Sequence, residues 1–94
     1  MARLDSYLKN SGLVKQRGEA KRACTSGRVQ VNGAPAKAGR EVRVGEVITL
    51  ETDSALVEAE ILDIPQRPAP RSQRERYYRV LRREARDPLA DLSF

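Results

Sequence analysis

The fold of this chain is indicated most directly by residues 26–33, Ser-Gly-Arg-Val-Gln-Val-Asn-Gly. Val29 and Val31 alternate with polar residues, which is the period of a strand with one buried face. Asn32-Gly33 follows at once, and this dipeptide readily adopts the positive φ angles of a tight hairpin turn. Gly27 stands where a left-handed C-terminal helix cap is expected. The stretch therefore predicts a helix end, a strand and a chain reversal in succession.

Two short helices are expected before this stretch. Apolar residues recur at helical spacing within Arg3 to Asn10, and Ser11-Gly12 breaks the pattern. A second amphipathic segment runs from about Arg17 to Ser26, although Gln16 and Gly18 are poor residues for a helix start. Small residues lie on its apolar face and predict close packing of the helix: Ala20, Ala23 and Cys24. We expect Cys24 to be a small core residue.

Strands are expected after the hairpin. Val42 and Val44 alternate with a polar residue, Gly45-Glu46 indicates a turn, and Val47 to Leu50 is a β-branched run suited to a packed strand. Another turn at 52–54 leads to a longer strand from Leu56 to Ile64, in which the period of two places Glu58 and Glu60 on one face. The pattern predicts a small, mainly antiparallel sheet and an α+β fold.

The C-terminal part is expected to be helical. Three prolines make Pro65 to Arg71 a stiff connector. Ser72 and Glu75 then have capping-box spacing, and a helix can continue to Arg86 before Asp87-Pro88 ends it. On a helical wheel one arc is apolar and would dock, with Tyr77 or Tyr78 left open as a base-stacking residue. The other arc is a ladder of phosphate-binding guanidinium groups: Arg76, Arg79, Arg82, Arg83 and Arg86.

These boundaries predict one small domain with an extension. Residues 1–64 form the α+β domain, residues 65–71 the connector, and residues 72–94 the basic helix and tail. A chain of 94 residues can bury only a modest core, so a deep catalytic cleft is not expected.

The composition excludes several classes of function. The chain has no His and one Cys, so it offers no zinc cluster, no Ser/His/Asp arrangement and no internal disulfide. We expect no enzymatic activity and no cofactor. No apolar run approaches the roughly 20 residues that cross a bilayer, and the N-terminus lacks the pattern of a secretory signal. These features predict a soluble cytoplasmic protein.

The charge is distributed in blocks. Residues 1–50 carry ten basic and four acidic side chains, residues 51–64 carry five acidic and no basic ones, and residues 65–86 carry eight basic and two acidic ones. The net charge of +5 therefore understates the two cationic blocks, and we expect a polyanionic partner. The second block contains only Arg, whose forked donors suit phosphate and whose plane stacks on bases. This composition favours RNA.

Cations of the first block are expected to converge. Arg17 and Lys21 lie four residues apart on one side of the second helix, and Arg28 follows its cap. A solvated face that pairs with Glu19 is the structural alternative. Asp5 can either cap or ion-pair at the first helix, or take part in recognition.

Four ordered segments resemble a known family: Arg3-Leu4-Asp5, residues 15–20, residues 26–33 and residues 44–48. Over Ala2 to Leu50 the chain resembles the RNA-binding domain named after ribosomal small-subunit protein four, also called the alpha-L motif. The resemblance implies two helices packed on a small sheet, with RNA held across the helix pair and the following strand. It implies that Asp5 orients the basic residues. The candidate RNA-binding residues of this part are Arg3, Asp5, Lys15, Arg17, Lys21, Arg22, Arg28, Asn32 and Lys37.

The short N-terminus and residues 77–84 narrow the resemblance. They resemble the RqcP family of bacterial ribosome-associated quality control and, next, the heat-shock protein fifteen family. The first resemblance implies a monomer that binds ribosomal RNA and tRNA on stalled large ribosomal subunits and helps a quality-control elongation factor to add alanine to the nascent chain. The second implies a factor for stalled subunits or for assembly. A protein-binding adaptor that acts through the C-terminal amphipathic helix is an alternative of another class.

Overall fold

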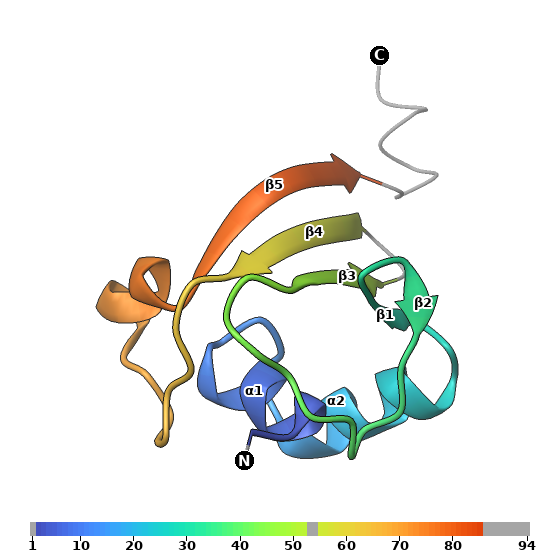
Figure 1. Cartoon of the computed structure of the whole chain (residues 1–94), viewed down its shortest axis with the longest axis horizontal. Coiled ribbons are helices and arrows are strands. Elements are labelled where there is room, and N and C mark those ends of the chain that lie inside the picture. The colour runs from blue at the N-terminus through green and yellow to red at the C-terminus, as the bar shows by residue number, and fades with distance from the viewer. Residues whose placement is uncertain (1, 53–54, 86–94) are drawn as a thin grey trace.

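Two helices pack against one face of an antiparallel sheet (Figure 1). The computed structural model describes residues 2–52 and 55–85. In these ranges the strand order is β2-β1-β3-β4-β5. The fold is therefore α+β, as the sequence predicts. The elements are α1 (Leu4–Asn10), α2 (Arg17–Thr25), β1 (Val29–Val31), β2 (Ala34–Pro35), β3 (Val47–Glu51), β4 (Ala55–Ile61), the 3-10 helix η1 (Arg71–Arg76) and β5 (Tyr78–Ala85).

The predicted hairpin forms at Asn32-Gly33. Both residues have positive φ angles, 53° and 84°, which this turn requires. Val31 pairs with Ala34 across the turn and with Ile48 of β3 on the other side. The hairpin therefore joins the end of α2 to the centre of the sheet, and the prediction from residues 26–33 is confirmed.

The core lies between the two helices and the sheet. Leu4, Tyr7 and Leu8 of α1 are at most 1% exposed, as the helical spacing predicts. Cys24 of α2 is buried beside them, which confirms it as a core residue, and its burial raises the pKa of the thiol. The sheet contributes Val29, Val31, Ile48, Leu50 and Ile61.

The expected C-terminal helix from Ser72 to Arg86 is wrong. Only the short helix η1 forms there, and the chain then becomes strand β5, which pairs with the whole of β4. Without β5, the seven residues of β4 would leave a row of unpaired backbone groups at the sheet edge. Tyr78 and Val80 also favour a strand, so tertiary pairing outweighs the capping-box spacing and the helical-wheel pattern that predicted a helix. Arg86 and the tail lie outside the described residues.

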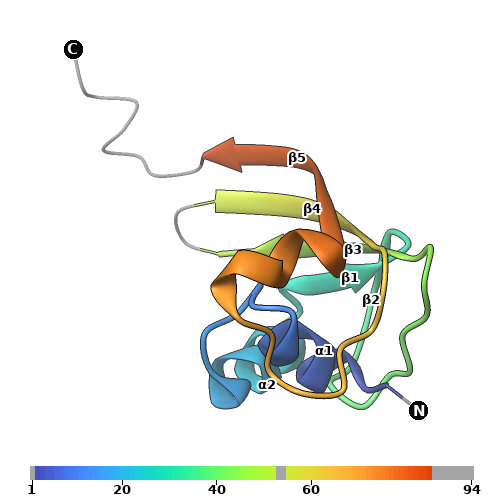
Figure 2. The same cartoon turned by 90° about the vertical axis from the view of Figure 1, so that its left-hand side faces the viewer.

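The proline-rich connector packs back onto α1 (Figure 2). The Ala69 amide donates to the Asn10 carbonyl at 2.9 Å, and the Tyr7 hydroxyl donates to the Tyr77 carbonyl at 2.5 Å. Gly12 has a φ of +88°, and a Cβ there would overlap the Arg74 guanidinium. These contacts fix the start of β5 against the N-terminal helix.

Among the helices of the described residues, none combines the length and the apolar character needed to span a bilayer.

Candidate RNA-binding surface

Asp5 is a buried carboxylate at the start of α1. Its side chain is 2% exposed, and one oxygen accepts a hydrogen bond from the Ser6 amide at 2.7 Å. The first turn of a helix stabilises negative charge because its amides have no partners within the helix. The position of Asp5 is set by the backbone, since its amide donates to the Ala38 carbonyl at 3.1 Å.

Two guanidinium groups converge on this carboxylate. The Arg3 Nε lies 3.3 Å from Asp5 Oδ1, and the Arg17 Nε lies 3.8 Å from Asp5 Oδ2. Both arginine side chains remain about half exposed, at 49% and 62%. A pair of cations that share one carboxylate keeps a net positive charge, and each guanidinium retains donors for a phosphate. We call Arg3, Asp5 and Arg17 the Asp5 cluster.

The loop between β2 and β3 holds Arg3 in place. The Leu4 amide donates to the Arg40 carbonyl at 2.8 Å, and the Val42 amide donates to the Ala2 carbonyl at 2.9 Å. Arg3 also forms an isolated antiparallel bridge with Glu41. The backbone on both sides of Arg3 is therefore fixed before the side chain meets Asp5.

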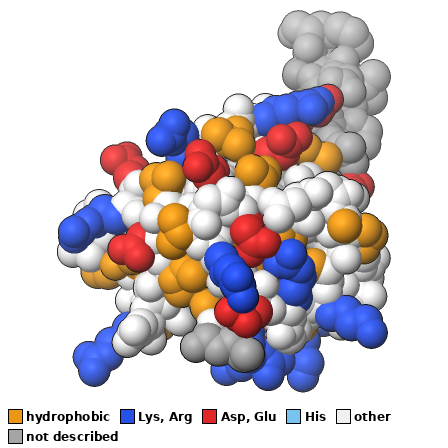
Figure 3. Space-filling view, viewed as in Figure 1, with side chains coloured by type: hydrophobic (Ala, Val, Ile, Leu, Met, Phe, Trp, Pro, Cys, Tyr) orange, Lys and Arg blue, Asp and Glu red, His pale blue; other side chains and the backbone are white. Residues whose placement is uncertain are grey.

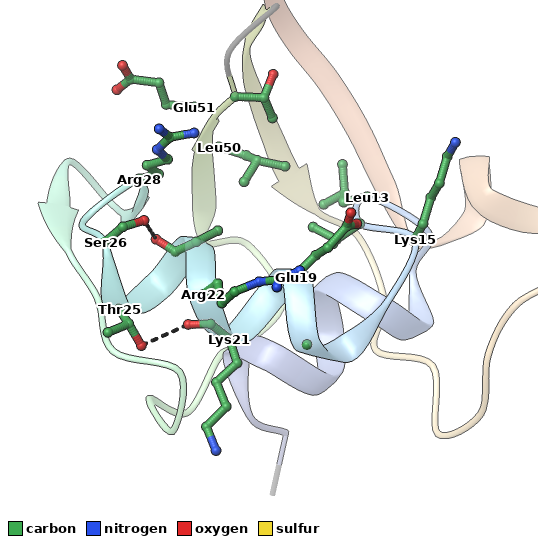
Figure 4. A pocket seen from close by; sticks show the side chains of 14 residues that line it. Leu13, Lys15, Glu19, Lys21, Arg22, Thr25, Ser26, Arg28, Leu50 and Glu51 are labelled. Atoms are coloured by element: carbon green, nitrogen blue, oxygen red, sulfur yellow. Dashed lines mark hydrogen bonds between the residues drawn. The ribbon is translucent and has the colours of Figure 1, made fainter.

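The cations of α2 divide between two sides of the helix. Lys21 lies one turn after Arg17 on the same side. Arg22 lines a surface groove together with Lys15 and Arg28, and Lys21 also contributes to the lining although its amine points away from the groove (Figure 4). Lys15, Lys21 and Arg22 are exposed, and within the described residues they form no ion pair. The predicted convergence of Arg17, Lys21 and Arg28 on one surface is therefore only partial.

Two further predicted residues lie on the hairpin side. Lys37 is exposed in the loop after β2. Asn32 is engaged within the protein, because its Oδ1 accepts from the Val47 amide at 3.0 Å and its Nδ2 donates to Glu46 at 3.1 Å. Asn32 thus ties the hairpin to β3. Contact of either residue with RNA stays a prediction.

Arg40 shows why charge alone is a poor guide to a binding surface. Its guanidinium donates to both oxygens of Glu46, at 3.4 and 3.1 Å, and these hydrogen bonds are the main reason that the pKa of the Glu46 carboxyl lies below its ordinary value. The cation is therefore used inside the loop that supports Arg3.

The expected ladder of C-terminal guanidinium groups is wrong. In a strand, Arg82 and Arg83 point to opposite faces. Arg82 pairs with Glu58 at 3.6 Å and with Glu84 at 2.6 Å, and Arg79 lies opposite Glu60 in the register. A carboxylate of the acidic block, Glu58, and a neighbour on the same strand, Glu84, thus neutralise Arg82. Arg76 lies apart from the strand, in η1. Tyr77 and Tyr78 are both half-buried, and base stacking by one of them stays a prediction.

The surface reflects this division of charge (Figure 3). Lys and Arg side chains gather at the lower edge, where Figure 1 places the two helices, whereas acidic and basic side chains alternate near β4 and β5. The Asp5 cluster and Lys21 therefore form the part of the predicted site that the fold brings together.

Comparisons with known proteins find relatives of this chain. Residues 2–48 match the S4 domain family. The chain is 44% identical over 62 residues to the RQC P-site tRNA stabilizing factor of Halalkalibacterium halodurans, covering 66% of this chain and 70% of that protein. It is 36% identical over 85 residues to the Listeria innocua protein of the same name, covering 90% and 91%. Among solved structures it resembles trimeric heat shock protein 15 of Vibrio cholerae, with a TM-score of 0.79, 28% identity, and coverage of 84% of this chain and 80% of that one.

Proposed function

The chain belongs to the S4 domain family and is a relative of the RQC P-site tRNA stabilizing factors, and on this basis we propose that it binds structured RNA through Arg3, Arg17 and Lys21. The Asp5 cluster is the observation that supports this proposal most directly. A buried carboxylate that holds two half-exposed guanidinium groups fixes two phosphate-binding groups at one place.

The physical mechanism is recognition of the RNA backbone. Cations at the surface release counterions condensed on the phosphates, and the contacts fix the position of the protein without reading the base sequence. Selectivity then comes from the shape of the RNA, since only a backbone of matching curvature reaches Arg3, Arg17 and Lys21 together. The protein acts by binding rather than by catalysis. No group of three potential metal-binding side chains occurs within residues 2–52 and 55–85.

The ribosomal role follows from the relatives. They are named as stabilizing factors for the P-site tRNA in RQC, and we assign this chain the same place: large ribosomal subunits that carry stalled nascent chains. There it would contact ribosomal RNA and tRNA in the cytoplasm, as a monomer, and support a quality-control elongation factor during alanine addition. The likeness to heat shock protein 15 favours a second candidate, a factor for stalled large subunits or for ribosome assembly.

The other predicted residues have a secondary part in this proposal. Five of them belong to the N-terminal half of the chain: Lys15, Arg22, Arg28, Asn32 and Lys37. Arg76 lies in η1 and Arg79 and Arg83 lie in β5, whereas Arg86 is outside the described residues. The ion pairs of Arg82 make it the weakest member of the C-terminal set. The rival adaptor function rested on a C-terminal amphipathic helix, and in the structure that segment is mostly strand β5.

A charge reversal at Arg17 tests the proposal. Arg17→Glu should abolish co-sedimentation with large ribosomal subunits at moderate salt, because it removes one phosphate contact and adds repulsion. Arg43→Glu is the matched control: Arg43 lines one surface pocket together with Arg3, but it is 77% exposed and pairs with Glu41 rather than with Asp5. Unchanged sedimentation of the Arg17 variant would refute the surface assignment. If the natural chain sediments with the subunits but supports no alanine addition in a reconstituted reaction, the second candidate is favoured instead.

A further inference from the structure

A groove beside α2 has features that phosphate contacts alone do not require (Figure 4). Arg22 lines it and lies five residues after Arg17, which places the two side chains about 140° apart around the helix. The opposite wall comes from the end of β3, and one end is closed by the loop between α1 and α2. The groove is thus next to the Asp5 cluster, on the other side of the same helix.

The floor of the groove is apolar. Leu13, Val14 and Ala23 are half-buried there, and Leu50 is 5% exposed. Gly18 lines the groove without a side chain, and a Cβ at that position would have nothing within 4 Å.

The rim of the groove is cationic. Lys15, Lys21 and Arg22 line it and form no ion pair in the described ranges, although the amine of Lys21 points away in Figure 4. The hydroxyls of Thr25 and Ser26 donate to their own helix, to the Lys21 and Ala23 carbonyls at 2.9 and 3.2 Å. Two carboxylates also line the groove, Glu19 and Glu51. Carboxylates repel phosphate but accept hydrogen bonds from the amino groups of bases.

We propose that this groove receives one unpaired base of the RNA that the Asp5 cluster binds, with Arg22 and Lys15 on the flanking phosphates. The inference rests on the proposed function and adds the kind of RNA: a helix with a bulge or an unstacked junction. A base has a flat apolar ring for the floor and amino groups for the Glu19 carboxylate. A phosphate chain by itself would gain nothing from an apolar floor and would be repelled by a carboxylate.

Continuity with the Asp5 cluster favours RNA over a protein partner. An RNA strand that crosses Arg17 and Lys21 needs only to pass α2, which is about 10–12 Å wide with its side chains, to reach Arg22. Unpaired RNA bases are commonly splayed out and held by stacking and edge contacts. An acidic amphipathic helix of another protein would match the same charges, and the test separates the two.

The test compares two RNA probes on the full chain: a fully paired hairpin and the same hairpin with a short unpaired bulge. Methyl NMR spectra of the labelled protein report the floor directly. The bulged hairpin should shift the methyl protons of Leu13, Val14 and Leu50 upfield, because a stacked ring produces a ring-current shift that a phosphate does not. The paired hairpin should leave these methyl signals in place.

Variants supply the second arm. Arg22→Gln should weaken binding of the bulged hairpin more than binding of the paired one, and it should lower the salt slope for the bulged probe by about 0.7. Gly18→Gln should obstruct the groove with the same preference. Arg43→Gln is the charge-matched control and should leave both affinities unchanged.

The outcomes distinguish this inference from the proposed function. If Arg17→Gln weakens both probes while the methyl signals stay in place and Arg22→Gln affects both probes equally, the groove holds no base and the inference is overturned. If Arg17→Gln affects neither probe, the proposed function fails at its own surface. Upfield methyl shifts that disappear in Gly18→Gln support the inference.

Discussion

Asp5 affects the binding surface through the positions of two arginine side chains as well as through its own negative charge. Its carboxylate lowers the positive charge of the Asp5 cluster, yet it also holds Arg3 and Arg17 in one place. A phosphate gains more from two positioned guanidinium groups than from two mobile ones, because the loss of side-chain entropy has already occurred on folding.

Replacing Asp5 by Asn tests this positioning role. Asp5→Asn makes the chain more positive, but we expect RNA affinity to fall by about tenfold, which corresponds to about 1.4 kcal/mol. The amide no longer attracts the guanidinium groups, and they repel each other. Fluorescence anisotropy with a labelled RNA hairpin measures the effect. Glu41→Gln is the matched control, because it makes the same charge change beside Arg43 and should leave affinity equal or higher. Equal affinities for both variants would show that Asp5 only reduces charge.

Tyr7 links α1 to the start of β5 through a single buried hydroxyl. Burial is the main cause that raises the pKa of Tyr7 above its ordinary value of 10.0, and nearby Tyr78 and Asp63 add to the shift. The hydroxyl donates to the Tyr77 carbonyl, which also accepts from the Leu62 amide at 2.9 Å. Removing the hydroxyl therefore leaves the carbonyl partly satisfied, and Tyr7→Phe should lower the free energy of unfolding by about 0.5–1.5 kcal/mol.

The same residue predicts a pH dependence. Above pH 10 the unfolded chain loses the Tyr7 proton while the folded chain keeps it, so the unfolded state binds fewer protons and the free energy of unfolding falls as pH rises. Below pH 10 this contribution is constant. Urea unfolding from pH 8 to pH 11 should show a steeper alkaline loss for the natural chain than for Tyr7→Phe. Parallel curves would mean that the folded state does not hold the Tyr7 proton more tightly.

At the scale of elements, α2 carries a structural weakness at its start. Gly18 lies in its first turn without a positive φ, and Gln16 makes no side-chain cap. Gly18→Ala should raise the free energy of unfolding by about 0.5–1 kcal/mol, since Ala favours the helix and a Cβ has room. Gly27→Ala is the control at the other end of the helix, where φ is +77° and the substitution should destabilise. Urea unfolding measures both, and a loss of stability in Gly18→Ala would contradict this account.

Local pattern predicted most elements of the N-terminal half and failed for β5. The hairpin and α1 depend on turn residues and apolar spacing that lie within a few positions of each other. β5 depends on β4, whose paired residues lie more than 15 positions earlier. Charged residues at 76, 79, 82, 83 and 86 fit one face of a helix, but only the sheet edge explains why the chain is extended.

The ion pair between Arg82 and Glu58 provides a way to measure the pairing of β5 with β4. In a double-mutant cycle, Glu58→Gln and Arg82→Gln should show a coupling of about 0.2–1 kcal/mol, because the two residues are cross-strand partners with a 3.6 Å ion pair. Arg83 with Glu58 is the matched comparison and should show no coupling, since Arg83 lies opposite Val57. Urea unfolding of the four variants in each cycle supplies the energies. A coupling energy of zero in both cycles would contradict the pairing of β5 with β4 in solution.

For the whole molecule, sequence order predicted the Asp5 cluster but not the groove. Arg3, Asp5 and Arg17 stand in the segments that carry the resemblance to the S4 domain family, so the resemblance identified them. The groove floor combines residues 13, 14, 23 and 50, which share no local pattern and meet only when β3 packs beside α2. The ion pairs of Arg82 could not be predicted from the sequence either, because they depend on the register between β4 and β5. Long-range pairing is thus the physical reason for each of the failures.

The salt dependence of RNA binding should report which cations act. If Arg3, Arg17 and Lys21 each contact one phosphate of a helical RNA, the logarithm of the association constant should fall against the logarithm of salt concentration with a slope of about −2.7. Arg17→Gln should make this slope shallower by about 0.9. Arg82→Gln removes the same charge but should leave the slope unchanged, because Glu58 and Glu84 already pair with Arg82 at 3.6 and 2.6 Å. Anisotropy titrations over a range of salt concentrations give the three slopes. Equal changes in both variants would mean that the RNA senses only the net charge of +5, and that the division of cations between the helices and the sheet has no part in binding.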